Sequence, residues 1–146
     1  MTFTNTEPSA LLYRARVADA DEELWIETGR ERELTYGTAL GSGDYRIIAT
    51  ALSAPGRIRP GAVVRTRVND QGEREIIRLV SRSPYRSASA LLSPHAADSI
   101  ELADLKARVS AAGGEWEQLI GGVFIVHVPR DSGIDPRAEI ASVARA

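Results

Sequence analysis

Two side-chain periodicities divide this chain. Between residues 11 and 82, apolar residues recur at every second position in short runs, and turn-forming residues separate the runs. After residue 83, the sequence adds segments in which apolar residues recur at the spacing of a helix turn. We therefore predict an α+β fold with a small antiparallel β-barrel-like half at 11–82 and a βαββα half at 83–146. Residues 1–10 are predicted to be a flexible N-terminus, and the two halves to form one compact unit.

In the first half, the strongest strand signal is a hairpin. Residues 62–68 alternate between two sets of side chains, residues 69–72 (Asn-Asp-Gln-Gly) have turn chemistry, and residues 73–82 return. Short consecutive strands joined by tight turns favour closure into a barrel, because closure removes exposed strand edges. The other strands predicted for this half are residues 11–17, 23–27, 35–40 and 45–52.

The second half begins with a predicted strand at residues 85–92, followed by a loop at residues 93–95. Next comes the strongest helix signal of the chain. Asp98 or Ser99 can accept hydrogen bonds at its N-terminus, and Gly113-Gly114 ends it. Its predicted buried face contains Leu102, Leu105, Val109 and Ala112.

A second hairpin and a last helix complete this half. Residues 116–120 and 123–128 are predicted to pair across Gly121-Gly122, taken as a two-residue turn. Asp135-Pro136 is typical of a helix N-terminus. The order strand, helix, strand, strand, helix resembles a fragment of the ferredoxin-like fold. This is a likeness of topology and implies no function.

Charge is unevenly distributed along the chain. The net charge is −2, from 18 basic and 20 acidic residues, which is unlike a general nucleic-acid binder. Residues 19–34 contain seven acids and two arginines, whereas residues 57–86 contain eight arginines and three acids. Two interpretations stay open: the charges pair across neighbouring strands, or they form separate acidic and basic faces that bind a partner.

No reactive constellation is evident in the sequence. The chain has no cysteine, which excludes disulfides, a thiol nucleophile and thiolate metal sites. His95 and His127 lack the spacing of metal ligands. We expect His127 to be a partly buried strand residue with a hydrogen-bond partner. Glu115 and Glu117 flank Trp116 and are expected to face solvent on an edge strand. The prediction is a non-enzyme without metal or cofactor.

The candidate binding residues belong to two groups. Arginines of the first hairpin and its flank could line one face of a barrel and bind RNA or single-stranded DNA, with Tyr45 or Tyr85 as a stacking platform. Trp25 lies beside the acidic run, where it either packs in the barrel or forms a protein-binding hot spot. The arginines concerned are Arg65, Arg67, Arg74, Arg78, Arg82 and Arg86.

The order of four short motifs resembles the small uncharacterised bacterial proteins of the domain-of-unknown-function 4265 family. The motifs are Glu-Leu-Trp-Ile-Glu at 23–27, Gly-Asp-Tyr-Arg-Ile at 43–47, Ile-Arg-Pro-Gly-Ala-Val-Val at 58–64 and Ile-Arg-Leu-Val-Ser-Arg-Ser at 77–83. The chain departs from that family at Ala62, where aspartate is usual, and after residue 48, where an aromatic segment is usual. The resemblance implies a small accessory or interaction module and no catalytic residue.

The function we expect is therefore a non-catalytic protein-binding or regulatory domain, for example one like an immunity protein or antitoxin. One alternative is the nucleic-acid-binding barrel. The other is a small-molecule site around His127, at the junction of the two halves. The expected partner is another protein, with a homo-oligomer as a further option and no membrane. Because the N-terminus does not resemble a signal peptide and no long apolar run occurs, the expected compartment is the cytoplasm.

Overall fold

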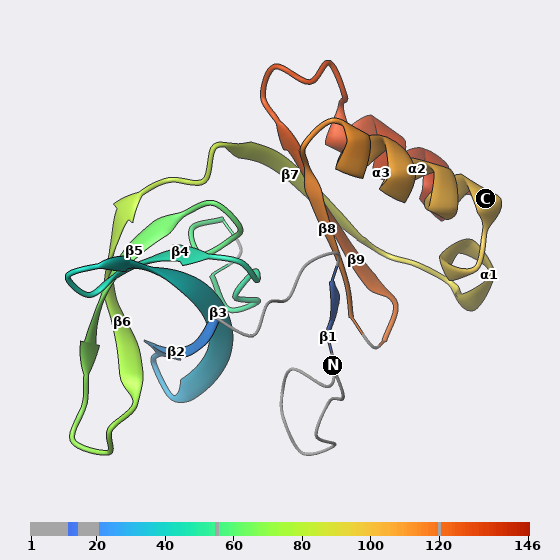
Figure 1. Cartoon of the computed structure of the whole chain (residues 1–146). Helices are drawn as coiled ribbons and strands as arrows, with labels where there is room; N and C mark the ends of the chain where they lie inside the picture. The colour runs from blue at the N-terminus through green and yellow to red at the C-terminus, as the bar shows by residue number, and fades with distance from the viewer. Residues whose placement is uncertain (1–11, 15–20, 55, 120) are drawn as a thin grey trace. The chain divides into compact units, whose positions relative to one another are not determined.

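The structure, a computed structural model, describes residues 12–14, 21–54, 56–119 and 121–146 (Figure 1). It confirms the α+β fold, with a closed five-stranded barrel followed along the chain by a second sheet and helices. The chain divides into two compact units rather than the predicted single one. One unit contains the barrel, and the other contains the second sheet with its helices, so each is described by itself.

The barrel closes in the order in which its strands occur along the chain, each strand antiparallel to the next. The last strand returns to the first in a parallel orientation, at the pair Trp25 and Glu75. The strands are β2 (Glu22–Thr28), β3 (Glu31–Gly41), β4 (Asp44–Ile47), β5 (Val63–Val68) and β6 (Arg74–Ser81).

Alternation along the barrel strands produces its core. Leu24 and Ile26 of β2 are buried inside the barrel, and so is Val64 of β5. The residues that alternate with them along each strand face outward. Gly37 is closely packed by its neighbours, because a Cβ there would be 2.7 Å from Leu24 Cδ1 and 3.0 Å from the Arg46 carbonyl oxygen. The rest of the buried apolar cluster is Tyr45, Ile47, Ala51, Ile58 and Ala62.

Two barrel strands differ in length from the prediction. β3 is longer than the predicted 35–40, whereas the predicted strand at 45–52 ends at Ile47. Beyond Ile47 the chain folds back on itself: the Gly61 N–H donates to the Ile47 carbonyl oxygen, and the Ala51 N–H to that of Ile58. These bonds hold the small residues of the connection against the barrel core, so the pattern of 49–51 reflects burial without a strand, whereas Leu52 is exposed.

The second unit contains a four-stranded antiparallel sheet in the order β1-β8-β9-β7. Its strands β7, β8 and β9 have the order of the predicted ferredoxin-like fragment, with β9 between β7 and β8. The predicted strand 11–17 was assigned to the barrel, and this is wrong for the part that the structure describes, because β1 pairs with β8. The strands are β1 (Leu12–Arg14), β7 (Tyr85–Leu91), β8 (Glu115–Leu119) and β9 (Val123–Pro129).

Helices α2 (Ile100–Ala111) and α3 (Pro136–Ala144) cover one face of this sheet. Ser99, one of the two predicted caps, accepts the Leu102 N–H, and Asp135 caps α3 as predicted. The predicted loop at 93–95 instead begins a short helix, α1 (Pro94–Ala97), capped by Ser93. None of the helices in the described ranges is long and apolar enough to cross a bilayer. The core under the helices contains Phe124, Val126, Val128, Leu102, Leu105, Val109, Ile140 and Val143.

The β8–β9 hairpin has a register that the sequence did not predict. Gly121 and Gly122 have φ values of +99° and +91°, so both need the positive φ expected of the turn. A two-residue turn would place Gln118 opposite Ile125, but Gln118 is opposite Phe124. A one-residue shift of register moves every side chain of a strand to the other face of the sheet. The register of this hairpin therefore decides on which face of the sheet Glu117 lies.

Candidate functional site

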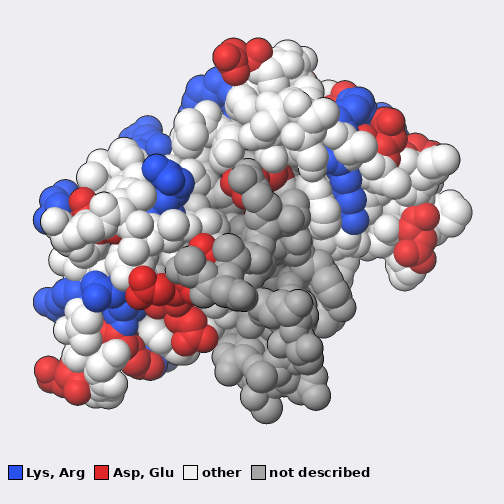
Figure 2. Space-filling view, viewed as in Figure 1, with Lys and Arg blue, Asp and Glu red and all other residues white. Residues whose placement is uncertain are grey.

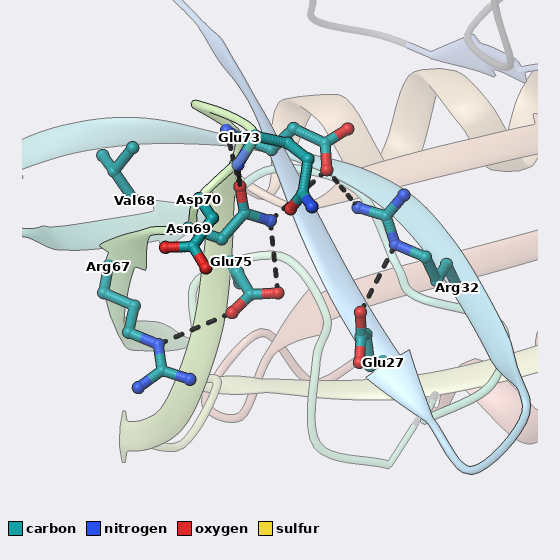
Figure 3. Close-up of a pocket in the computed structure, with 9 residues that line it drawn as sticks. Glu27, Arg32, Arg67, Val68, Asn69, Asp70, Glu73 and Glu75 are labelled. Atoms are coloured by element: carbon teal, nitrogen blue, oxygen red, sulfur yellow. Dashed lines mark hydrogen bonds and ion pairs between the residues drawn. The ribbon is translucent and has the colours of Figure 1, made fainter.

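A hollow of about 810 Å³ lies beside the β5–β6 turn of the barrel (Figure 3). Strands β2 and β3 supply Glu27 and Arg32, and the end of the β5–β6 hairpin supplies the rest. Val68 is the one lining residue with an aliphatic side chain. The hollow is thus a polar surface held by two hairpins of one barrel. The lining residues are Glu27, Arg32, Arg67, Val68, Asn69, Asp70, Gln71, Glu73 and Glu75.

Hydrogen bonds fix the arrangement of this lining. Arg32 Nη2 donates to Glu73 Oε1 at 2.6 Å, and Arg32 Nε lies 3.5 Å from Glu27 Oε1 (Figure 3). The Asn69 amide donates to both Glu73 and Glu75, and its Oδ1 accepts the N–H groups of Gln71 and Glu73. The turn predicted at residues 69–72 is therefore held by its own asparagine.

Carboxylates outnumber guanidinium groups in the hollow. Glu27, Asp70, Glu73 and Glu75 face two arginines, of which Arg67 Nε lies 3.5 Å from Glu75 Oε1. Within the part of the chain that the structure describes, Asp70 has no hydrogen-bond or ion-pair partner. The hollow consequently carries surplus negative charge and offers at least one carboxylate to a ligand.

Trp25 supports this site from the side. The Arg32 guanidinium carbon lies 4.2 Å from the centre of the Trp25 ring, an arrangement favoured by the ring's electrostatics. The indole therefore orients the arginine that links Glu27 to Glu73. Of the two alternatives for Trp25, its half-buried position fits packing against the barrel's own arginine.

Arg65 is already paired. It donates to both carboxylate oxygens of Asp44, on the neighbouring strand β4. The hydrogen bond from Arg65 holds the pKa of Asp44 below its usual value, with a further contribution from the charges of Arg65 and Arg78. The same hydrogen bond raises the pKa of Arg65. This pair is the cross-strand charge pairing that was one of the two interpretations of the charge pattern.

Tyr45 belongs to the barrel core, and Arg74 packs against its ring. Tyr45 is only 5% exposed, and the Arg74 guanidinium carbon lies 5.2 Å from its ring centre. Arg74 also donates to Thr66 Oγ1 at 2.9 Å. Burial raises the pKa of Tyr45, and its hydrogen bond to Glu22 raises it further. A ring buried in this way presents no face on which a base could stack.

The predicted arginines do not gather on one unpaired face. Arg67 pairs with Glu75, and Arg86 belongs to the other unit, where it lies 3.8 Å from Asp135. Arg78 and Arg82 are exposed and have no ion-pair partner among the described residues. Figure 2 shows acidic and basic side chains interspersed over this side of the barrel. Charge pairing, rather than two separate faces, describes the residues seen.

A buried hydrogen-bonded chain lies on the sheet face opposite the helices. His127 Nδ1 is 2.6 Å from Ser87 Oγ, and His127 Nε2 is 2.7 Å from Glu117 Oε2. His127 is 0% exposed and Glu117 is 1% exposed. The expectation that His127 is a strand histidine with a hydrogen-bond partner is confirmed, and its burial is complete.

The expectation that Glu117 faces solvent on an edge strand is wrong. β8 lies between β1 and β9, so it is not an edge strand. The register of the β8–β9 hairpin places Glu117 opposite Ile125, on the same face as His127, and Trp116 opposite Val126, under the helices. The signal that could have found the pair is the alternation of His127 with Ile125, combined with the correct turn length.

A serine hydrogen-bonded to a histidine, which is in turn hydrogen-bonded to a carboxylate, is the arrangement that activates a serine nucleophile in many enzymes. Here the three come from β7, β9 and β8 of one sheet. The half-buried Ser87 is the member closest to solvent. No group of three or more potential metal ligands occurs in the ranges that the structure describes.

Comparison with known proteins gives one likeness of fold. No protein-family model matches the chain, and no curated protein matches it. It is similar to a solved structure described as a novel crystal structure of a hypothetical protein from Neisseria gonorrhoeae. The two share 15% sequence identity with a TM-score of 0.57, and the likeness covers 87% of each chain. At this identity the likeness shows the fold alone, and the family resemblance drawn from the motifs stays a prediction.

Proposed function

We propose that this protein is a non-catalytic protein-binding domain, and that the barrel hollow of Figure 3 binds a basic segment of its partner. The supporting observation is the lining itself, in which four carboxylates face two guanidinium groups across a concave surface. Lysine or arginine side chains entering the hollow would compensate this surplus charge, because opposite potentials across an interface favour binding and specificity.

The lining favours a protein partner over a small organic ligand. Pockets for such ligands measure about 300–1,000 Å³ and are lined mainly by apolar and aromatic side chains. The hollow has a volume in this range, about 810 Å³, but only Val68 gives it an aliphatic contact. Charged and amide groups on an open surface suit the polar side chains of a protein segment instead.

The same charges disfavour nucleic acid. Phosphate binding depends on unpaired cationic groups, whereas Arg32 and Arg67 are paired with carboxylates inside the hollow and Arg65 is paired outside it. An immunity-like, antitoxin-like or regulatory role is compatible with a basic partner. The proposal commits to the partner's chemistry rather than to a pathway.

The test is fluorescence polarisation with two labelled peptides of equal length, one rich in lysine and arginine and one with glutamate in their place. We expect only the basic peptide to bind, with an affinity that falls as NaCl rises from about 50 mM to about 500 mM. Asp70→Lys should weaken binding by about tenfold, because it reverses a charge in the hollow that bonds to no other described residue.

Asp131→Lys is the matched control, since it makes the same charge change at an exposed turn of the other unit. Binding that is equal for both peptides, or lost equally in both variants, would contradict the proposal.

A second candidate function, covalent catalysis at Ser87, is favoured by one observation. The Ser87–His127–Glu117 chain has the hydrogen bonds that would let His127 take the serine proton and Glu117 orient the imidazole. It ranks second because His127 and Glu117 are almost fully buried and the hollow described above is not lined by any of the three.

A fluorophosphonate probe distinguishes the two functions. If Ser87 is a nucleophile, its Oγ bonds to phosphorus, its proton passes to His127, fluoride leaves, and the chain gains the mass of the probe less HF. Ser87→Ala should abolish labelling, and Ser89→Ala, two residues along the same strand face, should retain it. Absence of labelling in the wild-type chain would eliminate this candidate.

A further inference from the structure

The barrel has one weak junction. β2 pairs with β3 along its whole length, but with β6 only at Trp25 and Glu75 among the described residues. Past that pair, a groove of about 260 Å³ lies between the two strands. The connection between β4 and β5 contributes Ala54, Arg57 and Ile58 to its lining.

The lining of this groove combines aliphatic side chains with charged and polar ones. The aliphatic side chains come from β2, from β6 and from the connection between β4 and β5. They are Ile26, Ile76, Leu79 and Ile58, and all four are buried or half-buried. Ile77 adds an exposed rim, with 47% of its surface accessible. Its exposure follows from a bulge: Arg78 is opposite Arg65 and Ile76 is opposite Thr66, so Ile77 has no partner on β5. Covering this rim would bury apolar area that is now in water.

The rim also carries unsatisfied positive charge. Arg57 and Arg78 line the groove, are exposed, and have no ion-pair partner in the described ranges. Arg78 is directly opposite Arg65, and like charges in that position destabilise a strand pair. Asp44 compensates Arg65 through two hydrogen bonds. Among the described residues, Asp44 interacts with Arg78 through its charge but without a hydrogen bond, so a carboxylate from outside the chain would bind the Arg78 guanidinium directly.

We propose that this groove binds an extended segment of the partner protein in which an aliphatic side chain neighbours an acidic one. The aliphatic side chain fills the space between Ile26, Ile76 and Leu79, and the carboxylate contacts Arg78 and Arg57. A volume of about 260 Å³ is below the ~300–1,000 Å³ of pockets for whole organic ligands. It suits a single side chain, while the strand edges beside it favour an extended backbone.

This inference rests on the proposed function and makes it more specific. Glu27 lines both the acidic hollow and the groove, so the two adjoin along the seam of the barrel. One extended segment can therefore place basic residues in the hollow and an aliphatic–acidic pair in the groove. The recognised sequence would carry a basic cluster next to an aliphatic–acidic pair.

The experiment measures binding of labelled peptides to the full chain. The parent peptides join a Lys-Arg-Lys cluster to a Leu-Asp pair, in both orders. Two derivatives replace Leu with Ser or Asp with Asn. We expect the Ser derivative to bind about tenfold more weakly and the Asn derivative about fivefold more weakly than the better parent.

Matched variants of the protein locate the effect. Arg78→Glu should reduce affinity for the Asp peptide by about tenfold while leaving the Asn peptide almost unchanged. Arg82→Glu, an equal charge change at an exposed arginine outside the groove, should have little effect. Ile77→Ser should weaken binding about fivefold. Val80→Ser changes the other exposed bulge residue of β6 and should leave the affinity unchanged.

The outcomes separate this inference from the proposed function. One outcome is that binding of the basic cluster weakens with salt and with Asp70→Lys while the Leu and Asp substitutions in the peptide change nothing. In that case the groove proposal is overturned, and the function proposed for the hollow is retained. If no peptide binds, both are overturned. If the groove variants and their controls behave alike, the segment does not occupy the groove.

Discussion

At the scale of single residues, the Ser87–His127–Glu117 chain places a titratable pair where there is little water. Ser87 lies at one ring nitrogen of His127 and Glu117 at the other, so the imidazole is fixed in orientation. Removing one member takes a hydrogen bond away from a buried neighbour, which costs free energy because the neighbour stays out of water.

We expect His127→Ala to lower the free energy of unfolding by about 2–4 kcal/mol, through the packing lost at a fully buried position and the hydrogen bond lost by the buried Glu117. Urea denaturation of both proteins measures this. The control is His95→Ala, at the exposed histidine of α1, which should stay within about 0.5 kcal/mol of wild type. Equal effects at the two histidines would mean that the buried chain does not stabilise the fold.

Asp44 gives a prediction on acid stability. Because Arg65 lowers the pKa of Asp44 in the folded state, the pair stabilises the fold above the unfolded pKa, near pH 4. That contribution declines as pH falls through the lowered folded pKa. Thermal unfolding midpoints of wild type and Asp44→Asn should therefore differ at pH 6 and converge near pH 2. Asp131→Asn, at an exposed turn, serves as the control; curves for Asp44→Asn that stay parallel to wild type would refute the assignment.

The burial and contacts of a residue could be predicted where the local sequence pattern determines them. The alternation around His127 correctly indicated its strand and a partnered side chain. It could not indicate Glu117, because that depends on how Gly121-Gly122 turns the chain. A Gly-Gly pair is compatible with turns whose lengths differ by one residue. That difference exchanges Glu117 and Trp116 between the two faces of the sheet.

At the scale of elements, the β8–β9 turn is held against the strand beside it. The Leu92 N–H donates to the Gly122 carbonyl oxygen at 2.7 Å. A Cβ on Gly122 would lie 2.5 Å from the Leu92 carbonyl oxygen, whereas a Cβ on Gly121 would have nothing within 4 Å. The two glycines therefore have different requirements despite their similar φ values.

Gly121→Ala should destabilise the protein by about 1 kcal/mol, the cost of a left-handed conformation for alanine. Gly122→Ala carries the same cost and in addition must displace backbone, so we expect a clearly larger loss. Guanidinium denaturation of the two variants checks the ranking. A Gly122 variant as stable as the Gly121 variant would show that the turn shifts freely.

Elements marked by local chemistry were the predictable ones. The N-caps at Ser99 and Asp135 and the turn at Asn69 act within a few residues of sequence, and all three are confirmed. The end of β4, the bulges of β6 and the pairing of β1 with β8 depend on partners far along the chain. No local pattern carries that information.

At the scale of the whole molecule, charge is dispersed in pairs. The net charge is −2, and both arginines of β5 are paired with carboxylates of neighbouring strands. The alternation of strand and helix signals was sufficient to predict the α+β fold. It could not predict that the chain folds as two units or that the N-terminal strand joins the later one.

We expect no specific binding of single-stranded oligonucleotides by the full chain. One of its two candidate stacking rings, Tyr45, is buried, and Arg65 and Arg67 are paired with carboxylates. Fluorescence polarisation with a labelled oligothymidine at low and high salt measures this. A steep loss of affinity with salt, enhanced in Asp44→Asn where Arg65 is released, would instead establish the nucleic-acid function.

Among the described residues, β2 and β6 pair only at Trp25 and Glu75, and this has a consequence for how the barrel unfolds. If β2 and β6 separate there, the cylinder unrolls into a flat sheet whose two outer strands expose unbonded backbone, while the β3–β4 and β4–β5 ladders remain intact. Amide hydrogens at this junction should therefore exchange with solvent before those of β4. Two unrolled copies could then join edge to edge, which makes the place where the ring closes also the place where the chain is most prone to self-association.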